Sequence, residues 1–124
     1  MKDIAIYGAG GFGREVACLI RHINACEPEW NLVGFFDDGK NIGSANEYGK
    51  VLGGIDQLNA YDRNLSVVIA VGNPKTVQLL VDRIKNPNVD FPNLIAPNVL
   101  FFDRDSVSIG RGNIISFGCR LSCN

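Results

Sequence analysis

The segment richest in residues that could bind a ligand lies near the N-terminus, where positions 8–13 read Gly-Ala-Gly-Gly-Phe-Gly. This hexapeptide satisfies the pattern G-x-G-x-x-G and stands between an apolar run and a helical pattern. Glycines let the backbone turn tightly and approach a ligand closely, while the free N–H groups at a helix N-terminus favour a phosphate. The pattern therefore predicts a site for a phosphate-containing ligand; a tight turn that needs glycines only for packing is the alternative. The candidate contacts are Gly8, Gly10, Gly11, Phe12, Gly13 and Arg14.

Polar residues follow two other predicted strands. Asp37 lies 24 residues after Gly13, close to the interval of roughly 20 residues at which a dinucleotide-binding fold presents an acid to a ribose hydroxyl. Asp37 and Asp38 are thus candidate nucleoside contacts, with a solvated acidic turn as the alternative. Gly72 and Asn73 end a third strand at the same edge, where open α/β sheets bind ligands. Asn73 is equally well placed to cap the helix that follows.

A catalytic or metal centre is not recognisable among these residue types. Cys18, His22 and Cys26 share one face of a predicted helix, but Cys18 and Cys26 lie about 12 Å apart along its axis. Zinc ligands stand about 2.0 to 2.3 Å from one ion, so this stripe cannot form a single zinc site. His22 is the only histidine of the chain, and no Ser/His/Asp or Cys/His arrangement can be assembled. We therefore expect no metal and no catalytic residue within this chain.

The elements that must position the candidate residues alternate between strands and helices. Short apolar runs bounded by turn residues predict buried strands; they lie at 4–7, 32–36 and 67–71, with a fourth near 91–95. Strands that alternate with helices are typical of a parallel sheet with right-handed connections. The fold class predicted for residues 1–97 is therefore α/β, a Rossmann-like parallel sheet with flanking helices.

Helical periodicity follows the first and third strands, with a shorter helix around 55–58 and a loop rich in Gly, Asn and Ser from 39 to 48. Pro74 is expected in the first turn of the last helix, where its missing N–H costs nothing. The apolar stripes expected to face the sheet are Phe12, Val16, Ile20 and Ile23 in the first helix, and Val77, Leu80, Val81 and Ile84 in the last.

The pattern changes after Pro97, where Ile109, Ile115 and Leu121 recur every six residues with glycines between them. Such a hexapeptide repeat predicts the short faces of a β-helix, whose aliphatic residues point inward and whose coils are stable only when stacked. Residues 98–124 are thus expected to start a β-helix, with the chain ending inside its first coil.

The composition excludes several classes of protein. The chain has 124 residues, of which 46% are hydrophobic and 20% charged, and its net charge is −1, which predicts one packed core. No run of Lys or Arg could neutralise successive phosphates, so nucleic-acid binding is not expected. The apolar stretches are far shorter than the roughly 20 residues that cross a bilayer, and glycines interrupt the N-terminal region where a signal peptide would stay apolar. We expect a cytoplasmic protein with four reduced cysteines.

Four motifs together are more specific than the glycine pattern alone: YGAGGFGREV at 7–16, GFFDD at 34–38, AVGNPK at 70–75 and the hexapeptides from Ile109 onward. They resemble the bacterial sugar acyltransferases of the sialic acid O-acetyltransferase (NeuD) and UDP-amino-sugar N-acetyltransferase (PglD-like) group. The resemblance implies a Rossmann-like domain that holds a nucleotide-activated sugar, joined to a left-handed β-helix that binds acetyl-CoA and forms a homotrimer. It implies that Gly10, Gly11 and Gly13 face the diphosphate, Asp37 and Asp38 the uridine, and Gly72 and Asn73 the sugar.

The function that this resemblance implies is transfer of acetyl from acetyl-CoA to an amine or hydroxyl of a UDP-linked or sialic-acid-type sugar, in glycan biosynthesis. In such enzymes a β-helix histidine acts as general base; no histidine follows His22 here, so the chain alone is expected to bind ligand without turnover and without a stable trimer. Phe12 stands where relatives usually carry His or another polar residue.

Two other classes stay open, an NAD-binding oxidoreductase fragment and a non-catalytic nucleotide-binding module. The hexapeptide repeat favours the transferase over the oxidoreductase. We further expect Gly13→Asp to abolish ligand binding while the fold survives, because it would place a negative charge where phosphate should sit.

Overall fold

The centre of the molecule is a six-stranded sheet with the order β3-β4-β2-β1-β5-β6. This computed structural model describes residues 2–92, 94–95 and 114–115. Neighbouring strands run parallel except β3, which pairs antiparallel with β4. The strands of the sheet are β1 (Lys2–Tyr7), β2 (Trp30–Phe36), β3 (Ala45–Asn46), β4 (Gly49–Gly53), β5 (Leu65–Ile69) and β6 (Val89–Asp90). The predicted α/β fold with a mostly parallel sheet is confirmed.

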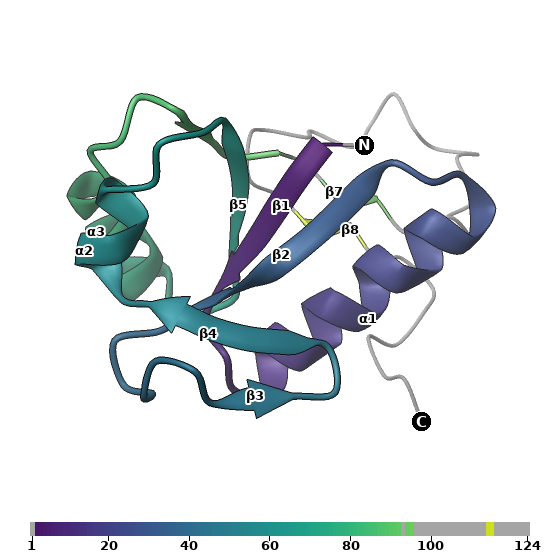
Figure 1. Cartoon of the computed structure of the whole chain (residues 1–124), viewed down its shortest axis with the longest axis horizontal. Helices are drawn as coiled ribbons and strands as arrows, with labels where there is room; N and C mark the ends of the chain where they lie inside the picture. Colours follow the sequence, from purple (N-terminus) through teal and green to yellow (C-terminus); the bar gives the residue numbers. More distant parts are fainter. Residues whose placement is uncertain (1, 93, 96–113, 116–124) are drawn as a thin grey trace.

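Helices cover both faces of the sheet. In Figure 1, α1 (Gly11–Cys26) lies on one side of the twisted strands, and α2 (Ile55–Asn59) and α3 (Pro74–Arg83) lie on the other. Successive side chains of a strand point to opposite faces. Ile4 and Ile6 accordingly pack in the cluster beneath α1, whereas Ala5 and Tyr7 pack in the cluster of α2 and α3. The central strand β1 is thus buried on both faces, as its unbroken apolar run predicts.

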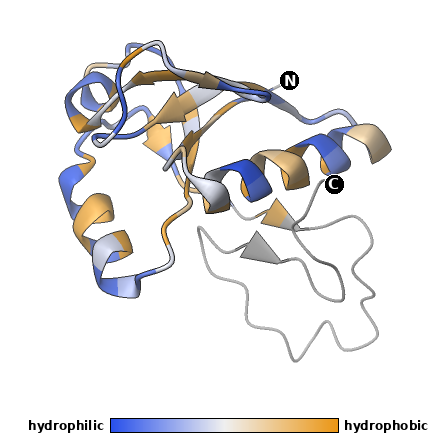
Figure 2. Ribbon diagram, turned by 90° about the horizontal axis from the view of Figure 1, so that it is seen from below, coloured by the Kyte–Doolittle hydropathy of each residue, from blue (hydrophilic) through white to orange (hydrophobic). Residues whose placement is uncertain are grey.

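The packing of α1 agrees with its sequence pattern except at the first residue of the predicted stripe. Val16 and Ile20 are fully buried, Ile23 packs on the same cluster, and Figure 2 shows apolar and polar residues alternating along the helix. Phe12 is 36% exposed and does not join the core. The prediction that Phe12 packs on the sheet is therefore wrong. It lies in the first turn of α1, where Gly13 and not Phe12 is the buried residue.

The segment 39–53 differs most from its prediction. We expected a loop as far as Tyr48, but β3 and β4 form a hairpin here, and β4 pairs with β2 through Val51 opposite Phe35. Asn46 shapes the turn, because its Oδ1 accepts hydrogen bonds from the N–H groups of Tyr48 and Gly49 at 2.8 and 3.2 Å. A strand with only two apolar residues carries too little period-2 signal to be recognised, so its pairing depends on β2.

The predicted fourth strand is displaced. The sheet is extended by β6 at Val89–Asp90, whereas β7 (Leu94–Ile95) pairs in parallel with β8 (Ile114–Ile115) in a separate two-stranded sheet. Pro92 stands between the two pieces and has no N–H for a ladder, which explains why one strand does not run through. The predicted domain boundary at 97, Ile109, Leu121 and the remainder of the repeat lie outside the described residues.

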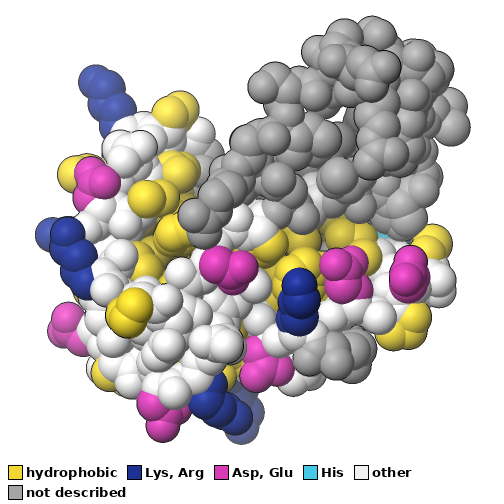
Figure 3. Space-filling view, turned by 90° about the horizontal axis from the view of Figure 1, so that it is seen from above, with side chains coloured by type: hydrophobic (Ala, Val, Ile, Leu, Met, Phe, Trp, Pro, Cys, Tyr) yellow, Lys and Arg dark blue, Asp and Glu magenta, His cyan; other side chains and the backbone are white. Residues whose placement is uncertain are grey.

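Two further features concern the charges on the surface and the length of the helices. Acidic and basic side chains are interspersed over the face shown in Figure 3. None of the helices in the described ranges has the length and apolar character needed to cross a membrane.

Candidate functional site

The glycine loop joins β1 to α1, and its four glycines fall into two pairs. Gly8 has a φ of +115°, and a Cβ there would lie 2.8 Å from the Ala70 carbonyl oxygen. A Cβ on buried Gly13 would lie 1.9 Å from the carbonyl oxygen of Gly8. These two glycines are needed for close packing of strand, loop and helix. Gly10 and Gly11 are exposed, and a Cβ on either would meet nothing within 4 Å, so a ligand can approach the backbone at these two.

The N-terminus of α1 carries no capping side chain. Its N-cap is Gly10, the first helical turn contains no acid, and the first helical hydrogen bond runs from the Arg14 N–H to the Gly10 carbonyl at 3.0 Å. The three N–H groups before Arg14 therefore have no carbonyl partner within the helix. Together with the positive end of the helix dipole, they make this turn attractive to an anion.

Asp37 ties the glycine loop to the end of β2. Its Oδ2 accepts a hydrogen bond from the Ala9 N–H at 2.8 Å, and its Oδ1 accepts one from the Gly39 N–H at 2.8 Å. The spacing that predicted Asp37 as a nucleoside contact thus places it against the loop. In this structure Asp37 fixes the conformation of the loop. The Ala9 N–H donates to Asp37 and is therefore not free to bind a ligand.

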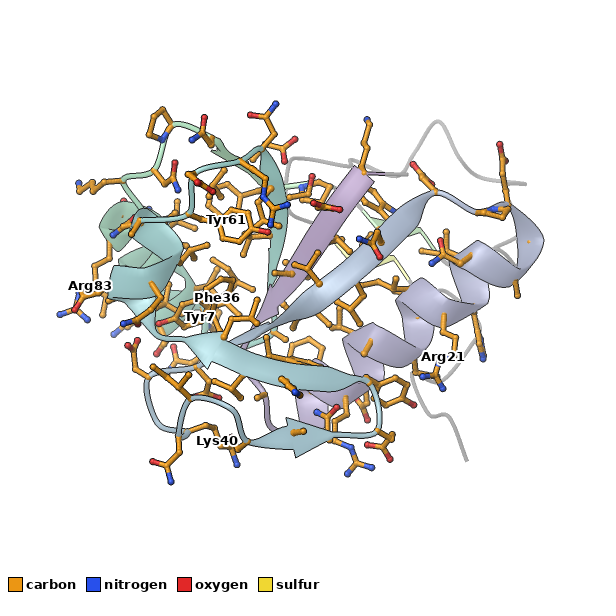
Figure 4. The ribbon with its side chains drawn as sticks, in the orientation of Figure 1. Tyr7, Arg21, Phe36, Lys40, Tyr61 and Arg83 are labelled. Carbon is orange, nitrogen blue, oxygen red and sulfur yellow. The ribbon has the colours of Figure 1, made fainter. Side chains whose placement is uncertain are left out.

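Asp38 faces α2 and the buried hydroxyl of Tyr7. Its Oδ2 accepts a hydrogen bond from the Tyr7 hydroxyl, and its Oδ1 accepts one from the Ile55 N–H at the start of α2, at 3.0 Å. Burial is the main cause that raises the pKa of Tyr7 well above its ordinary value, and the hydrogen bond to Asp38 raises it further. The hydroxyl therefore stays protonated. Figure 4 shows Tyr7 beside Phe36. This pair could not be predicted from the sequence, because a tyrosine at the end of an apolar strand is typical of a core residue.

Arg14 forms a two-pronged ion pair with Glu47 from the turn between β3 and β4. Nε donates to Oε1 at 2.8 Å and Nη2 donates to Oε2 at 2.6 Å. The hydrogen bond to Glu47 raises the pKa of Arg14, and the hydrogen bond from Arg14 lowers the pKa of Glu47. Arg14 was predicted as an anion contact, and its partner in this structure is a carboxylate of the chain itself. Glu47 was missed because it lies in the segment interpreted as a loop.

The glycine loop and the hairpin enclose a small cavity. Its volume is about 190 Å³, and its lining includes Ala9, Phe35, Lys40, Ser44 and Asn46. A larger hollow of about 590 Å³ lies at the opposite edge, at the amino ends of β1 and β5, lined among others by Lys2 and Asp90. The smaller cavity is the better candidate of the two, because open α/β sheets bind ligands at the carboxyl ends of their strands and its lining includes Ala9 of the glycine loop.

Gly72 and Asn73 follow β5 at the same edge of the sheet. The Ala70 N–H donates to the Tyr7 carbonyl at 2.8 Å, which keeps the ends of β5 and β1 together. Gly72 is exposed with open space around it. The Asn73 Oδ1 accepts a hydrogen bond from the Lys75 N–H at 2.9 Å, so the interpretation of Asn73 as the cap of α3 is confirmed. The predicted residues of all three strand ends therefore meet at one edge. Gly13 is buried there, and the exposed Asp38 accepts hydrogen bonds from Tyr7 and from the start of α2.

Metal ligands do not gather at this edge. Across the part of the chain that the structure describes, no three His, Cys, Asp or Glu side chains are grouped so that they could hold a metal ion.

Comparison with known proteins agrees with this fold. The family model for the PglD N-terminal domain matches residues 3–84. The acetyltransferase domain of PglB from Neisseria gonorrhoeae, solved in complex with acetyl coenzyme A, is 30% identical with a TM-score of 0.60, and the match covers 77% of this chain and 44% of that one. A second structure of that domain is 28% identical with a TM-score of 0.61, covering 78% and 45%.

The chain thus spans less than half the length of these two structures. No curated protein matches its sequence at a significant level. The resemblance expected from the motifs at 7–16, 34–38 and 70–75 is confirmed, because the family model covers all three. From its sequence and its structure alike, the chain belongs to the family of PglD N-terminal domains.

Proposed function

We propose that this chain is the nucleotide-sugar-binding part of a sugar acetyltransferase and that it binds a UDP-linked or related sugar at the carboxyl edge of its sheet. The observation that carries the proposal is the uncapped N-terminus of α1, where Gly10 and Gly11 lie open to solvent beside the cavity of about 190 Å³. The family match and the likeness to an acetyltransferase domain support it.

In this proposal the diphosphate lies over the first turn of α1. The N–H groups of Gly11, Phe12 and Gly13 donate to its oxygens, and Lys40, which lines the cavity, supplies a positive charge. The nucleoside lies toward Asp37, whose oxygens can each accept a second hydrogen bond while they hold the loop. The sugar then lies toward Gly72 and Asn73 across the ends of β1 and β5.

Acetyl transfer is assigned to the part of the protein that follows this domain. There a base would take a proton from the sugar amine or hydroxyl, which attacks the thioester carbonyl of acetyl-CoA and releases the thiol. The parallel pairing of β7 with β8, whose paired residues Leu94 and Ile114 are 20 positions apart, supports a coil of a β-helix after residue 97. The neighbouring structure that was solved with acetyl coenzyme A is more than twice as long as the matched segment, so acetyl-CoA binding and the homotrimer are proposed for a longer protein that contains this domain.

Calorimetry with the 124-residue chain tests this proposal. UDP and a UDP-linked amino sugar should bind, whereas NAD should not. The matched variants are Gly10→Asp and Gly10→Asn. Gly10 has the extended backbone of an N-cap and open space around it, so both side chains fit and can cap α1.

Only Gly10→Asp adds a negative charge at the phosphate position, and it should weaken UDP binding by about tenfold or more relative to Gly10→Asn, which corresponds to about 1.4 kcal/mol. Thermal melting should show both variants folded. Tight binding of NAD without binding of UDP would support the oxidoreductase alternative. Equal UDP affinity of the two variants would show that the phosphate does not bind at the N-terminus of α1.

A further inference from the structure

The ion pair between Arg14 and Glu47 lies beside the proposed phosphate position. Arg14 stands directly after the three N–H groups that begin α1, and long side chains of a helix lean toward its N-terminus. Its guanidinium holds the Glu47 carboxylate through two parallel hydrogen bonds of 2.8 and 2.6 Å. Arginine uses this same forked geometry for phosphate. Within the described ranges, no other ion pair joins a basic and an acidic side chain.

The turn that carries Glu47 is fixed at several points. Asn46 holds the N–H groups of Tyr48 and Gly49, and the guanidinium of Arg21 lies 4.4 Å from the centre of the Tyr48 ring. Arg14 and Arg21 are seven residues apart, which is about two helical turns and places them on the same side of α1. The hairpin turn thus presents its carboxylate to the first turn of the helix in a defined geometry.

The pair is nevertheless easy to exchange. The side chains of Arg14 and Glu47 are 53% and 51% exposed, and ion pairs at such positions contribute little because water solvates either partner well. A diphosphate would offer Arg14 an equivalent pair of oxygens and would in addition engage the N–H groups of the helix. Exchange of one anion for the other therefore loses little and gains the contacts to the helix N-terminus.

We infer that Glu47 acts as an internal anion that occupies Arg14 in the free protein and gives it up when the phosphates of the ligand bind. This inference rests on the proposed function, since it concerns the same site. Glu47 lowers the affinity for every anion at the N-terminus of α1. An anion that cannot engage both Arg14 and the helix N–H groups is thereby discriminated against.

A double-mutant cycle in UDP binding tests the inference with the wild-type chain, Glu47→Gln, Arg14→Gln and the double variant. Glu47→Gln should raise the UDP affinity about two- to fivefold, and Arg14→Gln should lower it. In the Arg14→Gln background the Glu47→Gln substitution should give no gain, because the guanidinium for which the two anions compete is gone. Glu15→Gln is the matched control: it removes the same charge from an exposed residue next to Arg14, and its effect should not depend on Arg14.

Each other outcome counts against a stated step. An equal gain in both backgrounds would make Glu47 a repelling charge only, and no gain in the wild-type background would leave it without influence; either result overturns the inference while the proposed function stands. If neither the wild-type chain nor any variant binds UDP, the proposed function fails and the inference falls with it. Coincident thermal unfolding of the wild-type chain and all of its variants shows that the comparison is between folded chains.

Discussion

At the scale of single residues, the four glycines of the loop do different work. The motif treats Gly8, Gly10, Gly11 and Gly13 alike, but only Gly10 and Gly11 leave open space at the helix N-terminus. The expectation that Gly13→Asp leaves the fold intact is wrong, because even a Cβ at this position would lie 1.9 Å from a backbone oxygen. Loss of ligand binding in that variant would reflect a displaced helix, so it cannot test phosphate binding.

Gly13→Ala should therefore destabilise the protein, with Gly11→Ala as its control. The extra methyl group at Gly13 forces the loop and α1 apart, at a cost of about 1 to 3 kcal/mol or more in the free energy of unfolding. At Gly11 the same methyl group meets nothing within 4 Å and lowers the conformational entropy of the unfolded chain. The free energy of unfolding should therefore stay the same or rise by about 0.4 to 1 kcal/mol. Urea unfolding measures both. Equal stability of the two variants would contradict the close contact between Gly13 and Gly8.

The positions of the polar candidates could be predicted from sequence, but their partners could not. Strand ends and spacing place Asp37 and Asp38 at the correct edge. That Asp37 accepts from the Ala9 N–H and Asp38 from the Tyr7 hydroxyl depends on how β1 and β2 pair, and a single sequence does not encode this in any local pattern. The pairing of Arg14 with Glu47 was missed for the same reason.

At the scale of elements, the strong periodic patterns were predictive and the weak ones were not. The unbroken apolar run of β1 and the stripe around Val16 and Ile20 in α1 carry their own signal. The hairpin of β3 and β4 carries almost none, and it forms because β2 offers an edge and Val51 completes the cluster beneath α1. The hairpin supplies one wall of the candidate cavity. The sequence therefore predicted the wall that the glycine loop forms, but not the wall that the hairpin forms.

The cap of α3 separates two roles of Asn73. Asn73→Ala removes the acceptor of the Lys75 N–H and should lower the free energy of unfolding by about 1 kcal/mol, within the range of roughly 0.5 to 2 kcal/mol found for lost caps. Asn73→Ser keeps a capping oxygen and should restore most of that stability. Urea unfolding measures the loss of stability, and calorimetry with a UDP-linked sugar measures any contact of Asn73 with the ligand. If Asn73→Ser is stable but binds the sugar more weakly than the wild-type chain, Asn73 also contacts the ligand. Full stability of Asn73→Ala would contradict the cap.

At the scale of the whole molecule, the doubly covered sheet brings the ends of β1, β2 and β5 to one edge. The glycine loop, Asp37 and Gly72 come from three separate stretches of sequence, and the parallel pairing of their strands unites them. The hollow of about 590 Å³ at the amino edge is larger than the cavity at the glycine loop. Cavity volume therefore favours the amino edge as the ligand site, whereas the uncapped N-terminus of α1 favours the carboxyl edge. The edge at which the ligand binds is thus the central question.

Amide chemical shifts of the ¹⁵N-labelled chain during a titration with UDP answer that question most directly. If the diphosphate lies on the N-terminus of α1, the largest changes should occur at the N–H groups of Gly11, Phe12 and Gly13, with smaller ones along the hairpin turn at Glu47. Gly10→Asp should suppress these changes, because its carboxylate occupies the same N–H groups. Saturable changes centred on Lys2, Ser66 and Asp90, which line the hollow at the amino edge, would place the ligand at the other end of the sheet and contradict the account.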